Sequence, residues 1–79
     1  MKLWLIRPRD PTSGAWDPWY DKAFGFVVRA ETEGQARKFA TAATGDENDD
    51  AWLSTMLSTC EELTADGDPG IVIRDFAAA

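Results

Sequence analysis

At 79 residues, with a formal net charge of −6 and no histidine, the chain has room for one domain with a modest core. Apolar residues make up 44% of the sequence and aromatic residues 11%, which argues against a disordered chain. The apolar run from Leu3 to Ile6 is too short for a signal peptide or a membrane span. We therefore expect a single compact domain over residues 1–79, located in the cytoplasm and without contact to a membrane.

The first eight residues, MKLWLIRP, have the alternation of a β-strand, with leucines on one face and Trp4 and Ile6 on the other. Pro8 ends this predicted strand, because proline has no N–H to donate to a neighbouring strand. Residues 9–21 contain two prolines and a glycine, the composition of an ordered, turn-rich loop. Residues 23–30, AFGFVVRA, alternate again and predict a second, half-buried strand. The aromatic residues of the loop are expected to pack on the body: Trp16, Trp19 and Tyr20.

A helix is predicted to begin after Thr32. Thr32 followed three residues later by Gln35 is a capping-box pattern, and Glu33 in the first turn suits the helix dipole. Gly45 predicts the C-terminal stop. Apolar residues recur with helical spacing and predict a narrow stripe that lies on a sheet. The members of this stripe are Ala36, Phe39, Ala40 and Ala43.

The last third of the chain predicts two more strands. Residues 51–56, AWLSTM, are compatible with a helical turn or an irregular segment, and the sequence does not decide between them. LSTCEEL at 57–63 and GIVIRDFA at 70–77 have strand composition. The Asp-Gly and Pro-Gly pairs of 64–70 favour a hairpin between them. The predicted fold is α+β, in the order β-β-α-β-β, with one helix packed on one face of a mostly antiparallel sheet.

Little catalytic or metal chemistry is available to this chain. Cys60 is the only cysteine, so no internal disulfide forms, and no histidine exists to activate the thiol or to ligate zinc. Asp46 begins a register of acidic residues that resembles a calcium loop, but its sixth and twelfth positions are Ala51 and Leu57 rather than glycine and glutamate. We therefore expect no metal, no cofactor and no enzymatic activity.

Charge is distributed unevenly along the chain. Residues 1–43 carry seven cations and five anions, whereas residues 44–79 carry nine anions and one cation, Arg74. Binding of phosphates requires clustered Lys and Arg, so the acidic half is not expected to bind nucleic acid directly. One interpretation is a solvated surface that keeps a small domain soluble.

A second interpretation of the acidic half is mimicry of nucleic acid. Carboxylates on a folded scaffold would imitate the phosphates of a duplex, which carry about one charge per 1.7 Å of axis, and would occupy a basic groove on a DNA-handling protein. Trp52, beside the acids in sequence, would anchor that contact. The candidate partner-binding residues are Asp46, Glu47, Asp49, Asp50, Glu61, Glu62, Asp66, Asp68 and Trp52.

Two other classes of function remain possible on the sequence. The aromatic loop 16–20 predicts an apolar patch typical of a cytoplasmic protein–protein interaction module. An enzyme would need a pair of carboxylates in a cleft, and Glu61 and Glu62 do not provide one, because adjacent residues of a strand point to opposite faces.

The segments MKLWLIRP, WDPWYDKAFGFVVRAETE and STCEEL, together with PGIVIRDFAAA, resemble a group of short proteobacterial and prophage-borne proteins that have no catalytic motif. In size and acidity the chain is also similar to anti-CRISPR proteins, small phage products that block CRISPR effectors, some of them by imitating DNA. This resemblance implies an inhibitor that acts as a monomer or weak dimer in the bacterial cytoplasm. Its implied partner is the large, DNA-recognising subunit of a type I Cascade complex.

Overall fold

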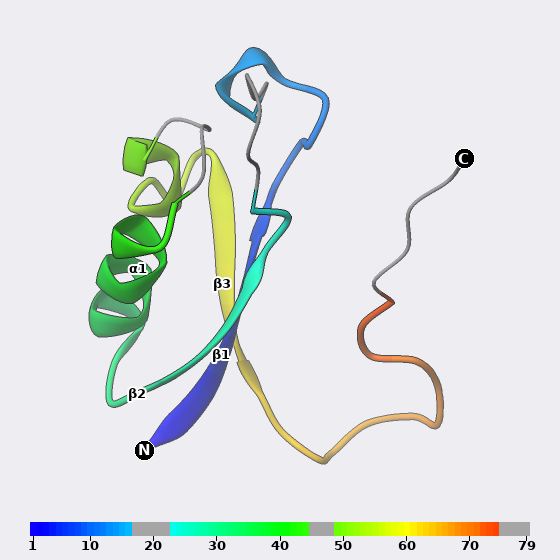
Figure 1. The fold of residues 1–79 in the computed structure, drawn as a ribbon. Coiled ribbons are helices and arrows are strands. Elements are labelled where there is room, and N and C mark those ends of the chain that lie inside the picture. Colours follow the sequence, from blue (N-terminus) through cyan, green and yellow to red (C-terminus); the bar gives the residue numbers. More distant parts are fainter. Residues whose placement is uncertain (17–22, 45–48, 75–79) are drawn as a thin grey trace.

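The computed structural model describes residues 1–16, 23–44 and 49–74 and has an α+β fold (Figure 1). Within this part of the chain, one α-helix packs on a three-stranded antiparallel sheet. The elements are β1 (Lys2–Pro8), the 3-10 helix η1 (Gly14–Trp16), β2 (Phe26–Ala30), α1 (Glu33–Ala42), the 3-10 helix η2 (Asp49–Trp52) and β3 (Ser58–Leu63).

The first strand of the sequence is the central strand of the sheet. The strand order is β2-β1-β3, and both neighbours run antiparallel to β1. Ile6 pairs with Phe26 on one side and with Cys60 on the other. α1 therefore connects two edge strands that flank β1. The predicted strand at residues 1–8 is confirmed, as is the end at Pro8, and β3 confirms the predicted third strand.

Strand β2 is shorter than the predicted strand of residues 23–30. It starts at Phe26. Gly25 precedes it at a close approach of the backbone: a Cβ atom at this position would lie 3.0 Å from the carbonyl oxygen of Ile6. Phe24 is exposed rather than on the buried face of the strand. A side chain at position 25 would therefore press on β1 beside the pair of Ile6 and Phe26, the end of the β1–β2 ladder.

The predicted N-terminus of α1 is confirmed. The hydroxyl of Thr32 accepts a hydrogen bond from the backbone N–H of Gln35 at 3.2 Å, and the Gln35 side chain accepts one from the N–H of Glu31 at 2.8 Å. The predicted apolar stripe is correct for Ala36 and Ala40 but wrong for Phe39, which is 54% exposed, and for Ala43, which is also exposed. The charged Arg37 is buried instead, at 5% exposed. The segment that α1 packs against offers several hydrogen-bond acceptors to the guanidinium of Arg37.

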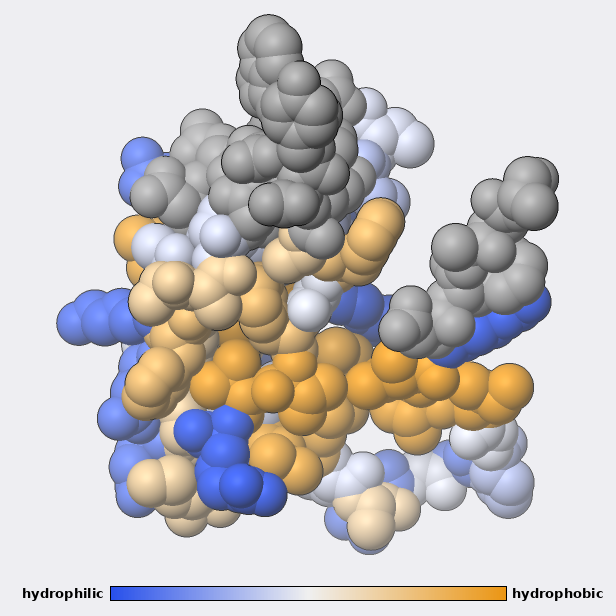
Figure 2. Space-filling view, in the orientation of Figure 1, coloured by the Kyte–Doolittle hydropathy of each residue, from blue (hydrophilic) through white to orange (hydrophobic). Residues whose placement is uncertain are grey.

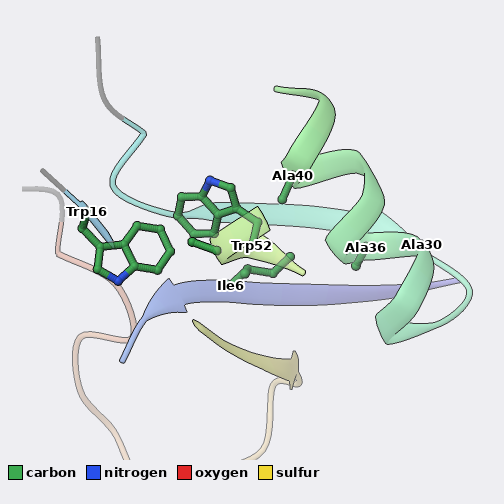
Figure 3. Close-up of a cluster of buried hydrophobic side chains, with 7 residues drawn as sticks. Ile6, Trp16, Ala30, Ala36, Ala40 and Trp52 are labelled. Carbon is green, nitrogen blue, oxygen red and sulfur yellow. The ribbon is translucent and has the colours of Figure 1, made fainter. Parts of the chain in front are cut away.

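The core lies between α1 and the sheet. Trp16 and Trp52 lie beside each other there, with ring centroids 4.6 Å apart (Figure 3). The ring of Phe26 also packs on Trp52, edge to face, with the two ring centroids 4.9 Å apart. The helix contributes only small side chains, so its backbone approaches the sheet and the two indole rings fill the remaining volume. The segment 51–56, which the sequence left undecided, contains the end of η2.

The predicted fourth strand and its hairpin are wrong for the residues that the structure describes. Residues 64–74, which we call the C-terminal arm, contain no strand and leave the sheet after β3 (Figure 1). Each of them is exposed. Turn-forming pairs permit a hairpin but do not hold one, and no hydrogen bond between described residues closes the loop 64–69. Residues 75–77 of the predicted strand lie outside the described residues.

Candidate binding surface

Among the acids predicted for the binding surface, those whose side chains the structure describes follow β3 from end to end. Asp50 lies in η2, which adjoins the start of β3. Glu61 and Glu62 lie within the strand, and Asp66 and Asp68 lie in the arm that leaves its end. All five are exposed. The remaining acids predicted for the surface are less defined: Asp46 and Glu47 lie outside the described residues, and the structure describes only the backbone of Asp49.

Two of these acids are compensated by cations of the central strand. The carboxylate of Glu61 lies 3.4 Å from the guanidinium of Arg7, and that of Glu62 lies 3.4 Å from the ammonium of Lys2. The two ion pairs form on opposite faces of the sheet, since adjacent residues of β3 alternate. Glu61 and Glu62 therefore act neither as a catalytic pair nor as two adjacent members of one negative row.

The other acids lie at the two ends of β3. Six residues of extended chain span about 20 Å, which separates Asp50 from Asp66 and Asp68 by at least a strand length (Figure 1). At physiological ionic strength, charges this far apart are largely screened from each other, because the Debye length is about 8 Å. The described acids thus form two negative regions rather than one dense cluster.

The predicted anchor of this surface is not on the surface. Trp52 is 0% exposed and belongs to the core, so it is unable to contact a partner as the sequence predicted. Trp16 of the aromatic loop is also fully buried, which removes it from the apolar patch of the alternative interaction module. Trp19 and Tyr20 lie outside the described residues. Both buried tryptophans are the large side chains that compensate for the alanines of α1.

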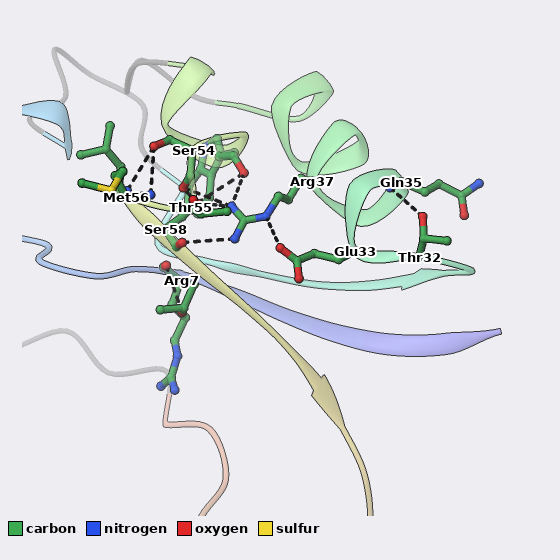
Figure 4. A network of polar contacts seen from close by, with 12 residues as sticks. Arg7, Thr32, Glu33, Gln35, Arg37, Ser54, Thr55, Met56 and Ser58 are labelled. Atoms are coloured by element: carbon green, nitrogen blue, oxygen red, sulfur yellow. Dashed lines mark hydrogen bonds and ion pairs between the residues drawn. The ribbon is translucent and has the colours of Figure 1, made fainter.

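A buried polar cluster around Arg37 was not expected from the sequence. The guanidinium of Arg37 donates through Nε to Glu33 at 2.9 Å and through Nη1 to the carbonyl of Trp52 at 2.9 Å (Figure 4). It also donates to the hydroxyl of Ser58 at 2.7 Å, to its carbonyl at 3.2 Å, and to the carbonyl of Ser54 at 3.2 Å. We call these residues the Arg37 cluster.

The hydrogen bonds of the Arg37 cluster hold together α1, the end of η2 and the start of β3. The Ser58 hydroxyl accepts from Arg37 and has carbonyl acceptors at Ala51 and Ser54, at 2.8 and 2.9 Å, for its single proton. One buried cation therefore satisfies the backbone between η2 and β3 and joins it to α1. The spacing of Glu33 and Arg37, four residues apart on a helix, was a signal for their ion pair. No local signal identifies the acceptors in residues 52–58.

Two other groups have shifted pKa values. Burial raises the pKa of the Cys60 thiol, and the negative charge of Glu33 adds to this effect. As predicted, Cys60 is a half-buried strand residue. The pKa of Asp10 is lowered, first by the hydrogen bond from the Thr12 hydroxyl and then by the one from its backbone N–H. Neither group is part of a set of converging reactive side chains among the described residues.

Within residues 1–16, 23–44 and 49–74, no group of three or more acidic or thiol side chains is placed to hold a metal ion. No helix in the same part of the chain is long and apolar enough to cross a membrane. Comparisons with protein families, with curated proteins and with solved structures found no match.

Proposed function

We propose that this protein is a small, non-catalytic inhibitor that binds a basic surface of a DNA-handling protein. The observation that supports this proposal is the excess of negative charge in residues 44–79, of which Asp50, Asp66 and Asp68 are exposed on a folded scaffold. The contact surface in this proposal consists of these three acids and of Asp46, Glu47 and Asp49. Trp52 has no part in it, because it is buried.

The particular partner that we propose is the DNA-recognition surface of a type I CRISPR Cascade complex. A groove that binds a duplex is lined with Lys and Arg, and an acidic protein competes for it by electrostatic complementarity. Because the described acids occupy both ends of β3, the inhibitor would contact two stretches of such a groove rather than one point. Electrostatic steering would speed this association and would make it sensitive to salt.

The test is competition between the protein and a labelled duplex for purified type I Cascade, followed by fluorescence anisotropy at low and high salt. We expect inhibition at low salt that weakens steeply as salt rises. Replacing Asp66 and Asp68 by Lys adds two positive charges per residue, changing the net charge from −6 to −2, and should weaken inhibition by about tenfold or more. Reversal of the four acids in residues 46–50 should abolish it.

A matched control keeps the net charge of the variant but changes other acids. Replacing Asp10 and Glu31 by Lys, both exposed acids of the N-terminal half, also adds four charges and should leave inhibition close to that of the unmodified protein. Equal loss in both double variants would show that total charge matters and not the proposed surface. Inhibition that survives reversal of all six contact acids, in a protein shown to be folded by circular dichroism, would reject the proposal.

A further inference from the structure

The C-terminal arm exposes three consecutive branched apolar side chains. Ile71 is 81% exposed, Val72 68% and Ile73 47%. Figure 2 shows that strongly hydrophobic residues reach the surface on this face of the molecule. Isolated apolar residues on a surface are common, but a run of β-branched residues has the composition of a strand and is costly to leave in water. The arm thus has the features of a strand that lacks its sheet.

The sheet, in turn, has an edge without a described neighbour. β3 pairs with β1 on one side only, and in the described part of the chain no strand lies on its other side. Unpaired N–H and C=O groups of an edge strand form a template for another strand. Glu61 and Glu62 in the middle of β3 disfavour direct pairing of two β3 edges, because like charges would face each other.

We propose that the arm of one molecule adds as a fourth strand to the β3 edge of a second copy, and that the two copies exchange arms. Each chain then contributes one donor strand and one acceptor edge, so a two-fold symmetric pair satisfies the β3 edges of both copies. The arm of a single chain leads away from its own β3, and each of its residues is exposed (Figure 1). The occupant of the edge is therefore the arm of the partner copy.

The pairing that best matches the side chains is antiparallel, with Ile73 opposite Cys60. This register places Ile71 and Ile73 on the face of β3 that α1 covers, where the half-buried Cys60 lies at the margin of the core. It places Arg74 on the other face, on the diagonal from Glu61. Arg7 already contacts Glu61 from the far side, so the acidic edge would receive a cation from each neighbouring strand.

The single native cysteine allows a direct test on the full chain. Opposite residues of antiparallel strands have Cα atoms about 4.5–5.5 Å apart, which is within the range that a disulfide spans. Ile73→Cys, oxidised mildly, should therefore give a covalent dimer through Cys60. Val72→Cys is the matched control, because its thiol points to the opposite face and should link far less. Combining Ile73→Cys with Cys60→Ser should remove the crosslink.

Sedimentation of the unmodified chain and of Ile71→Pro provides a measurement without covalent chemistry. In this register the N–H of Ile71 faces the open-edge carbonyl of Glu62, and proline removes that donor; Ile71 is 81% exposed in the single chain, so circular dichroism should not change. We expect a dimer for the unmodified chain and dimerisation weakened by about tenfold or more for Ile71→Pro. An intramolecular disulfide in Ile73→Cys, which would show the arm on its own β3, overturns the proposal. Monomers at all concentrations, or equal crosslinking of positions 72 and 73, overturn it as well. Because these variants leave every acid in place, failure here is independent of the proposed inhibition.

Discussion

Replacement of Arg37 by Met tests how much the buried cluster contributes to stability. The side chain keeps much of its length and apolar stem but loses five donated hydrogen bonds. The carbonyl of Ser54 still accepts from the Ser58 N–H, and the carbonyl of Trp52 still has the Ser58 hydroxyl at 3.3 Å. The carbonyl of Ser58 loses its bond to the guanidinium outright. One buried acceptor left without a hydrogen bond costs about 1–3 kcal/mol, and the loss of bonds from a charged donor adds to this cost.

We therefore expect Arg37→Met to lower the free energy of unfolding by about 3 kcal/mol. A domain of this length has a total stability of about 4–12 kcal/mol, so the loss is a quarter or more of it. In thermal unfolding the same change corresponds to about 12–24 °C in Tm. Urea titration followed by tryptophan fluorescence measures it, because Trp16 and Trp52 are buried in the folded chain.

Two further substitutions distinguish the stability that comes from the buried hydrogen bonds of Arg37 from that of its ion pair with Glu33. Glu33→Gln removes only the partner that is 44% exposed, which water replaces, so it should cost less than about 1 kcal/mol. Arg37→Lys keeps the charge but not the planar fork, and should fall between the other two. A value for Arg37→Met within about 0.5 kcal/mol of the unmodified protein, the size of an ordinary surface substitution, would refute the reasoning.

Further predictions follow from local geometry. Gly34→Ala should raise stability by about 0.5–1 kcal/mol in urea unfolding, because the site is helical and open, whereas Gly25→Ala should lower it, since the new Cβ meets a backbone oxygen. Thr32→Ala should cost about 1 kcal/mol by removing the N-cap, and no loss would contradict the assigned cap. The raised pKa of Cys60 means that its thiolate forms at lower pH in the unfolded chain than in the folded one. Stability from this group should be complete at neutral pH and should fall as the pH rises from the ordinary thiol pKa through the folded value; Cys60→Ala should flatten that part of the pH profile.

Part of the candidate surface could be predicted from sequence and part could not. The location of negative charge in the second half is a property of composition, and the exposure of Asp50, Asp66 and Asp68 agrees with it. The compensation of Glu61 and Glu62 depends on which strand lies beside β3. The burial of Trp52 depends on how much volume the helix leaves open. Neither the ion pairs nor the burial of Trp52 can be inferred from the residues next to these positions in the sequence.

The sequence by itself determined the elements that a local pattern marks. The alternation of residues 1–8 predicts the strand but does not choose a buried face, because Leu5 and Ile6 point to opposite faces and both are buried. Thr32 with Gln35 places the start of α1 through a hydrogen bond between residues three apart. The cap needs no knowledge of the rest of the fold, because its interacting groups are neighbours along the chain.

Only the tertiary structure decided which side chains share the core. Arg37, rather than Phe39, is buried because its acceptors lie 15 to 21 residues further along the chain and satisfy its charge. The arm has the composition of a strand but does not pair with its own sheet, although a local turn would have allowed it. Pairing and burial are gained between distant residues, so the outcome depends on what those residues offer and not on the pattern of the segment itself.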